Sequence, residues 1–123
     1  VLENMDFQNI DFSMYDVNPF IKNKILSFLN SDFMKSKLQY PMYKEYEFVR
    51  KKDYELYHGV IDLMIEEKDK IILVDYKLKN IDDDSYQIQL NGYRDYMKEK
   101  TGKNVECYLY SILNEEFLEV LDK

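Results

Sequence analysis

The stretch Ile71-Ile72-Leu73-Val74-Asp75-Tyr76-Lys77 decides the fold of this chain. Its first four residues are apolar on both faces of an extended strand, which is typical of a central strand covered on both sides. Because side chains alternate across a strand, Asp75 and Lys77 share a face with Leu73. Charged residues at the end of a buried strand conflict with the local pattern, and such conflicts are expected at functional sites. We therefore predict a buried strand over residues 70–78 that carries part of a site.

A second strand is predicted directly before it, over residues 55–66, with the polar turn Lys68-Asp69 between the two. A tight turn there places Asp62 directly opposite Asp75, with Cβ atoms about 5 Å apart. Two carboxylates so close repel each other, and a divalent cation bound through their oxygens offsets that repulsion. Lys77 lies diagonal to Asp62, within reach of a phosphate or an attacking water.

A further strand is expected over residues 43–51, followed by a turn near Lys52-Asp53. If the turn falls at Asp53-Tyr54, Glu45 lies opposite Asp62 and adds a third carboxylate. A slip of one residue moves Glu45 to the far face of the sheet. Both interpretations stay open, because a solvated strand glutamate is as well supported as a site residue.

Helices are predicted on both sides of these strands. Residues 1–15 are irregular, and Asn18 with Pro19 then begins a helix that runs to about Asn30. A short helical stretch follows over residues 32–38.

A long helix is expected after the acidic loop of residues 80–84. Asp84 or Ser85 caps it, it reaches about Lys100, and Gly102 is placed to end it. Two more strands are predicted over the ranges 105–113 and 116–121. The element order predicts one α/β domain over residues 1–123, with a central mixed sheet of four to five strands flanked by helices, a helical lead-in over 1–42 and a catalytic core over 43–123.

Composition narrows the classes of protein. The chain has 123 residues, a formal net charge of −7 and 12 tyrosines, so it has material for a core but lacks the basic balance of an autonomous nucleic-acid binder. Cys107 is the only cysteine, which excludes a disulfide framework or a four-cysteine cluster. No apolar run approaches the ~20 residues of a membrane span. The first residue, Val1, predicts a piece of a longer protein.

Three segments together resemble the PD-(D/E)XK nuclease superfamily, and most closely its RecB/AddA-type branch, the C-terminal nuclease domain of a helicase–nuclease. They are Gly59-Val60-Ile61-Asp62, Val74-Asp75-Tyr76-Lys77, and Gln89 with Tyr93 one helical turn later. Lys44-Glu45-Tyr46-Glu47-Phe48 resembles the strand that opens the family's sheet. The resemblance covers about residues 25–121.

The resemblance implies a restriction-endonuclease-like core and a set of roles. Asp62 and Asp75 form the metal site, and we expect the backbone carbonyl of Tyr76 as a further ligand. Lys77 helps to activate water or stabilises developing charge. The matching acid on the first strand is Glu45, which orients a water. Gln89 and Tyr93 sit near the DNA, although a helical stripe that contains Tyr93 is also typical of plain core packing.

The function implied is metal-dependent hydrolysis of DNA by a deoxyribonuclease that acts as an exonuclease. Mg²⁺ is the expected cofactor, and Mn²⁺ is expected to substitute for it. The implied parent is a cytoplasmic ATP-dependent helicase–nuclease of double-strand-break repair and recombination. The implied partners are DNA, the helicase region of the parent chain and a second subunit, with no membrane.

Two departures from the family pattern keep other functions open. Ile61 stands where the family name has proline, and no histidine precedes His58, whereas RecB-type nucleases carry a metal-binding histidine on an upstream helix. Together with the acidic balance, the missing histidine favours one alternative, a degenerate domain that guides DNA or braces a partner subunit. Another alternative is a stand-alone nuclease of the restriction or phage type.

Overall fold

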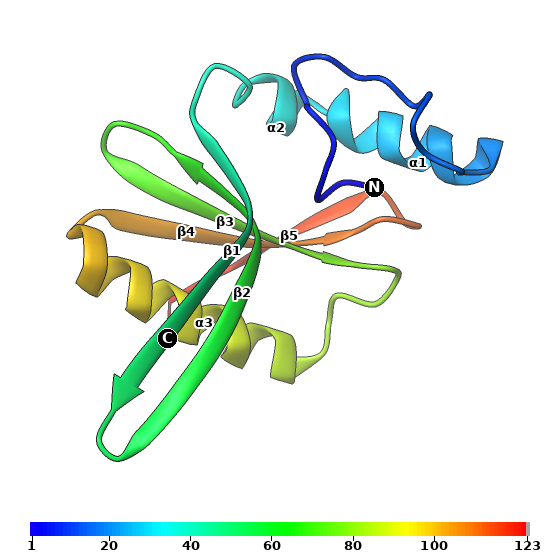
Figure 1. Cartoon of the computed structure of the whole chain (residues 1–123). Helices are drawn as coiled ribbons and strands as arrows, with labels where there is room; N and C mark the ends of the chain where they lie inside the picture. The colour runs from blue at the N-terminus through cyan, green and yellow to red at the C-terminus, as the bar shows by residue number, and fades with distance from the viewer. Residues whose placement is uncertain (123) are drawn as a thin grey trace.

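A computed structural model describes residues 1–122 of the chain. Its elements follow one another in the order predicted from the sequence (Figure 1). They are α1 (Pro19–Leu29), α2 (Asp32–Lys35), β1 (Met42–Lys52), β2 (Glu55–Glu66), β3 (Lys70–Lys77), α3 (Asp84–Thr101), β4 (Asn104–Ser111) and β5 (Glu116–Val120).

The strands form one five-stranded sheet in the order β1-β2-β3-β4-β5. β3 and β4 are parallel, and α3 makes the crossover between them, whereas the other neighbours are antiparallel. β3 is therefore the central strand, as its apolar run predicts, and Ile71 to Val74 are fully buried. The predicted α/β class with a mixed sheet is confirmed, and it is consistent with a restriction-endonuclease-like core.

Helices cover both faces of this sheet (Figure 1). The N-terminal segment, α1 and α2 lie on one face, and α3 lies on the other. Alternate residues of β3 divide between the two layers, with Ile72 and Val74 under α1 and with Ile71 and Leu73 under α3. No helix within residues 1–122 is long and apolar enough to cross a membrane.

Residues 1–15 have no helix or strand, as predicted, but they contribute to the core. Leu2, Met5 and Phe7 are buried in the core cluster between α1 and the sheet. The ring of Phe7 packs edge-on against Phe28 of α1, with centroids 6.2 Å apart. The irregular segment is thus fixed by apolar burial rather than by backbone periodicity.

The helix ends follow capping chemistry. The side chain of Asn18 accepts a hydrogen bond from the backbone N–H of Ile21 at 2.8 Å and begins α1, as predicted. Gly102 adopts φ 71° and ends α3, also as predicted. The cap of α3 is Asp83 rather than Asp84 or Ser85. Asp83 accepts from both the backbone N–H and the hydroxyl of Ser85, so it begins the helix earlier than expected.

α2 is shorter than the predicted stretch of residues 32–38, because the chain leaves the helix after Lys35 and continues in turns. β4 also ends before the predicted limit, at Ser111.

The β1–β2 hairpin extends well beyond the rest of the sheet. β2 pairs with β3 only from Leu63 to Glu66, whereas its pairing with β1 continues to Lys52 and Glu55. The outer part of the hairpin, residues 48–59, is therefore a two-stranded ribbon, which runs alongside α3 (Figure 1). Phe48 anchors this ribbon, since its ring stacks on Tyr96 of α3 with centroids 4.0 Å apart.

Candidate metal centre

Asp62 lies at the point where β2 separates from β3. The register is the predicted one, but the last pair of the ladder joins Leu63 to Val74, and Asp62 and Asp75 would form the next. Instead, the carboxylate Oδ2 of Asp62 accepts a hydrogen bond from the backbone N–H of Tyr76 at 2.9 Å. The predicted register therefore holds, and the ladder of paired residues ends one position before Asp62 and Asp75, where β2 turns away toward the ribbon.

The two carboxyl groups nevertheless meet. Burial, a hydrogen bond with the carboxyl of Asp75 and the charge of Asp75 together raise the pKa of Asp62 to about 7, against the lowering effect of the Tyr76 N–H. A raised pKa is the physical signature of carboxyl groups crowded into a poorly solvated site. The pair thus carries an electrostatic cost that a bound cation would offset.

Asp75 is the more buried of the two acids, with 7% of its surface exposed. Its Oδ2 atom is buried and has no hydrogen-bond partner within residues 1–122. The ammonium of Lys77 lies 2.9 Å from that oxygen, in an ion pair that lacks hydrogen-bond geometry. The same ammonium lies 4.1 Å from the centre of the Tyr86 ring on α3. Lys77 is therefore held between an acid of its own strand and an aromatic ring of the helix.

The register of β1 and β2 places Glu45 opposite Asp62, but these two residues do not pair in the β1–β2 ladder. Its neighbours pair as predicted, Lys44 with Leu63 and Tyr46 with Ile61. Glu45 itself has φ 52°, a left-handed conformation that is uncommon for residues other than glycine. Its side chain is exposed, and its charge is the smallest of the causes that raise the pKa of Asp62. The sequence predicts the neighbourhood of Glu45 correctly but not its backbone.

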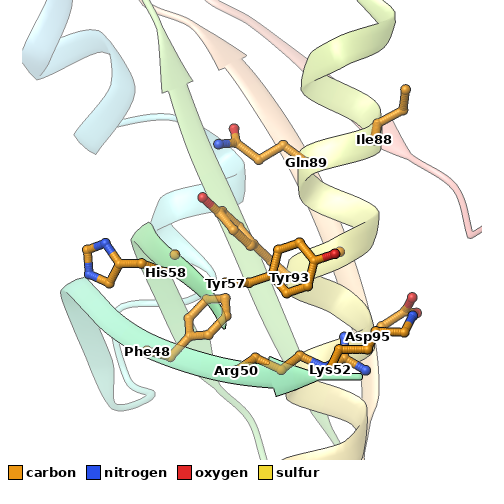
Figure 2. Close-up of a pocket in the computed structure, with 11 residues that line it drawn as sticks. Phe48, Arg50, Lys52, Tyr57, His58, Ile88, Gln89, Tyr93 and Asp95 are labelled. Carbon is orange, nitrogen blue, oxygen red and sulfur yellow. The ribbon is translucent and has the colours of Figure 1, made fainter. Parts of the chain in front are cut away.

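Tyr93 and Gln89 project from α3 toward the strands, whereas Ile88 points away (Figure 2). Burial raises the pKa of Tyr93, and so does the charge of Asp75. A hydrogen bond from the backbone N–H of Val60 to the Tyr93 hydroxyl lowers the pKa. Tyr93 thus lies close enough to Asp75 and Asp62 for their charges to act on its hydroxyl. Gln89 is exposed and lies one helical turn away, on the same side of the helix.

Gly59 makes this arrangement possible. A Cβ atom at this position would lie 2.4 Å from Cζ of Phe48 and 2.8 Å from Cε1 of Tyr93. Only a residue without a side chain allows both rings to lie against the strand. Gly59 therefore sets the distance between the ribbon and α3 beside the site.

The acids at this centre fit a hard divalent cation that keeps part of its water shell. Within residues 1–122 no group of three or more His, Cys, Asp or Glu side chains is arranged to hold a metal. Mg²⁺ is commonly bound through one or two carboxylates together with waters and substrate phosphates. Asp62 and Asp75, whose carboxyl groups meet in a poorly solvated place, suit that mode. His58 lies on the ribbon, 3.6 Å from Glu47.

Tyr86 belongs with Leu90, Tyr93 and Met97 to a stripe at helical spacing that is typical of core packing, and its contact with Lys77 was not predicted from the sequence. The available signal was its position one turn before Leu90, a fully covered residue of the same stripe. That spacing places Tyr86 on the sheet-facing side of α3, at the end where β3 stops.

A cleft of about 410 Å³ lies beside the acidic pair, between the ribbon and α3 (Figure 2). Asp62, Asp75 and Lys77 do not line it, whereas Tyr93 of α3 does, and so does Gly59, which lies three residues before Asp62 on β2. Its lining consists of Phe48, Arg50, Lys52, Tyr57, His58, Gly59, Ile88, Gln89, Gly92, Tyr93 and Asp95.

Comparison with known proteins supports a relationship to one component of a helicase–nuclease. No protein-family model matches the chain. The A subunit of the ATP-dependent helicase/nuclease of Clostridium botulinum strain Hall is 38% identical over 82 residues, which cover 59% of this chain and 6% of that protein. The protein of the same name from Listeria welshimeri is 36% identical over 84 residues, which cover 57% of this chain and 7% of that protein.

The chain therefore spans only a small part of the length of the curated relatives that it matches. A third relative, which has the same name and comes from Clostridium perfringens strain SM101, is 36% identical over 70 residues, or 50% of this chain. Over more than half of its residues, this chain is similar to a short region of the A subunit of the ATP-dependent helicase/nuclease.

Proposed function

We propose that this chain is a metal-dependent DNA nuclease domain of the PD-(D/E)XK type, which hydrolyses phosphodiester bonds from DNA ends. One observation carries the proposal: the carboxyls of Asp62 and Asp75 meet where β2 and β3 separate, with the ammonium of Lys77 2.9 Å from Asp75. Two acids and a lysine at one point supply metal ligands and a positive donor for phosphate chemistry. The relatives, which are named as components of an ATP-dependent helicase/nuclease, support the same assignment.

Asp62, Asp75 and the backbone carbonyl of Tyr76 are the groups that would hold Mg²⁺, or Mn²⁺ in its place. When bound, such a cation lowers the pKa of water and stabilises negative charge on a phosphoryl group. The raised pKa of Asp62 supports this assignment, because a cation beside the two carboxyl groups offsets the cost of crowding them together.

The other residues have roles that follow from their positions. Lys77, held between Asp75 and the ring of Tyr86, presents its ammonium to a phosphate oxygen or to the attacking water. Glu45, which is exposed beside Asp62, accepts a hydrogen bond from a water at the edge of the site. The amide of Gln89 and the hydroxyl of Tyr93 donate hydrogen bonds to the DNA strand.

The acidic balance of the chain suits a domain that receives its DNA from elsewhere. With a net charge of −7, the chain as a whole repels a polyanion. We propose that the parent is a cytoplasmic ATP-dependent helicase–nuclease of double-strand-break repair and recombination. Its helicase region and a second subunit would then deliver the strand.

Cleavage of end-labelled linear and circular single-stranded DNA in Mg²⁺ or Mn²⁺ tests this function. The wild-type chain is expected to shorten the linear strand only, and Lys77→Ala is expected to lose cleavage by about 10²-fold or more, as for other groups that stabilise transition-state charge. Lys79→Ala is the matched control, since Lys79 is an exposed lysine two positions further on. Equal cleavage by wild type and Lys77→Ala would contradict the proposal.

The second candidate is a non-catalytic domain that guides DNA or braces a partner subunit. The acidic balance favours it, and so does the lack of a third clustered ligand residue within residues 1–122. Metal-dependent cleavage that Lys77→Ala abolishes excludes this candidate. A wild-type chain that stays inactive both alone and within the assembled parent supports it.

A further inference from the structure

The cleft is formed by two elements, the ribbon of residues 48–59 and α3. The ribbon supplies Phe48, Arg50, Lys52 and Tyr57, and α3 supplies the wall that includes Gln89, Tyr93 and Asp95 (Figure 2). On the ribbon, Arg50 pairs with Tyr57, and Lys52 shares the face of Arg50, because side chains alternate along β1. Val49 and Lys51 consequently project from the opposite face.

One cation of the cleft is available to an anion. The ammonium of Lys52 forms no hydrogen bond or ion pair within residues 1–122, whereas the guanidinium of Arg50 lies 2.7 Å from the carboxylate of Glu99. Asp95 is the acidic residue of the lining and lies on the helix side. A phosphate is therefore accommodated on the ribbon side, at Lys52, rather than against α3.

The cleft also offers aromatic surface. Tyr57 is 48% exposed, and its hydroxyl donates to Glu55 at 2.6 Å, so the tyrosine is held at the cleft by its polar end. Tyr93 lines the inner end, and the charges of Asp75 and Asp62 act on it. Gly59 also lines the cleft and lies three residues before Asp62 on β2, so the cleft opens on the same strand that carries the acid.

We infer that this cleft binds one unpaired nucleotide of the DNA strand, with its base on Tyr57 and its phosphate at Lys52, next to the bond held at Asp62 and Asp75. The inference rests on the proposed function for the identity of the strand. A volume of about 410 Å³ is within the range of small-ligand sites, and it suits one nucleotide rather than a helix. Stacking on an aromatic ring is open to every base.

The same geometry selects single strands. In a duplex the faces of each base are covered by its neighbours, so a base reaches the ring of Tyr57 only when it is unstacked. Lys52 on one wall and Tyr57 beside it match the phosphate and the base of one nucleotide. The cleft therefore suits an unpaired nucleotide rather than a base-paired one.

Binding of a short fluorescent oligothymidylate to the 123-residue chain in EDTA tests the inference without any cleavage. Tyr57→Ala is expected to weaken binding roughly ten-fold through lost stacking, and Lys52→Gln is expected to weaken it several-fold and to reduce its salt dependence. Tyr57→Phe keeps the ring and is expected to keep the affinity. Duplex DNA of the same length is expected to compete poorly.

The ribbon supplies matched controls. Lys51→Gln removes the same charge from the opposite face, and Tyr54→Ala removes a fully exposed tyrosine at the hairpin turn. Both are expected to bind like wild type, and thermal unfolding checks that every variant is folded. Equal losses in Lys51→Gln and Lys52→Gln, unchanged binding by Tyr57→Ala, or no binding by the folded wild type would each overturn the inference.

Failure of this inference and failure of the proposed function are distinguishable. Binding that Tyr57→Ala and Lys52→Gln weaken, in a chain that never cleaves DNA, leaves the cleft assignment intact and contradicts the nuclease. Cleavage by a chain whose single-strand binding is insensitive to both substitutions supports the nuclease and contradicts the cleft assignment.

Discussion

The carboxylate of Asp62 on β2 accepts a hydrogen bond from the backbone N–H of Tyr76 on β3, just beyond the last paired residues of the two strands. A side chain thus replaces the main chain as the partner of that N–H, and β2 is free to turn toward the ribbon. The same turn brings the carboxyl of Asp62 to that of Asp75. The place where β2 separates from β3 is therefore also the place where the two carboxyl groups meet.

The raised pKa of Asp62 predicts how stability of the metal-free chain depends on pH. The folded pKa is about 7, well above the ordinary value of 3.8, so the folded state binds more protons than the unfolded state between these values. The contribution of Asp62 to stability is then fully present below about pH 4 and is lost as pH rises toward 7. Urea unfolding in EDTA across this range measures it. Asp62→Asn is expected to flatten the profile, whereas Asp82→Asn, an exposed loop acid, is expected to keep it; the same slope in both variants would contradict the assignment.

The contact between Lys77 and Tyr86 predicts a positioning role for the ring. The ammonium lies 4.1 Å from the ring centre, and such a cation–π contact contributes about 0.5–2 kcal/mol. Tyr86→Leu is expected to lower kcat roughly two- to thirty-fold with little change in KM, because Lys77 loses its orientation rather than its charge. Tyr86→Phe is expected to restore the rate. Steady-state cleavage kinetics check this, and a change confined to KM would argue for a plain DNA contact.

Two glycines near the cleft predict opposite effects of the same substitution. At Gly59 a Cβ atom meets Phe48 at 2.4 Å and Tyr93 at 2.8 Å, so Gly59→Ala is expected to destabilise the chain by about 1–3 kcal/mol. At Gly92, within α3, a Cβ atom meets nothing within 4 Å, and Gly92→Ala is expected to stabilise by about 0.5–1 kcal/mol. Chemical denaturation measures both. Similar effects of the two substitutions would mean that the ribbon does not pack on α3 as described.

Much of the fold could be predicted because its signals are local. The buried run of β3 fixes the centre of the sheet, and the tight turns on either side of β2 fix the registers that place Glu45, Asp62 and Asp75 near one another. Asn18 and Gly102 mark helix ends through their capping chemistry. Each of these signals depends on residues that are close in the chain.

The remaining features depend on tertiary context. The left-handed backbone at Glu45 could not be predicted, because the residue is neither glycine nor asparagine. Nothing local distinguishes Asp83 from Asp84 as a helix cap. The separation of β2 from β3 on the N-terminal side of Leu63 depends on how the ribbon packs against α3. The contact between Tyr86 and Lys77 likewise joins elements that only the crossover brings together.

Titration of the chain with Mn²⁺ by calorimetry tests most directly whether Asp62 and Asp75 hold the cation on which cleavage depends. The account predicts binding by the wild type and by the loop control Asp82→Asn, and loss of that binding in Asp62→Asn and in Asp75→Asn while both variants remain folded. Mn²⁺ binding that survives in folded Asp62→Asn and Asp75→Asn with the affinity of the wild type would contradict it.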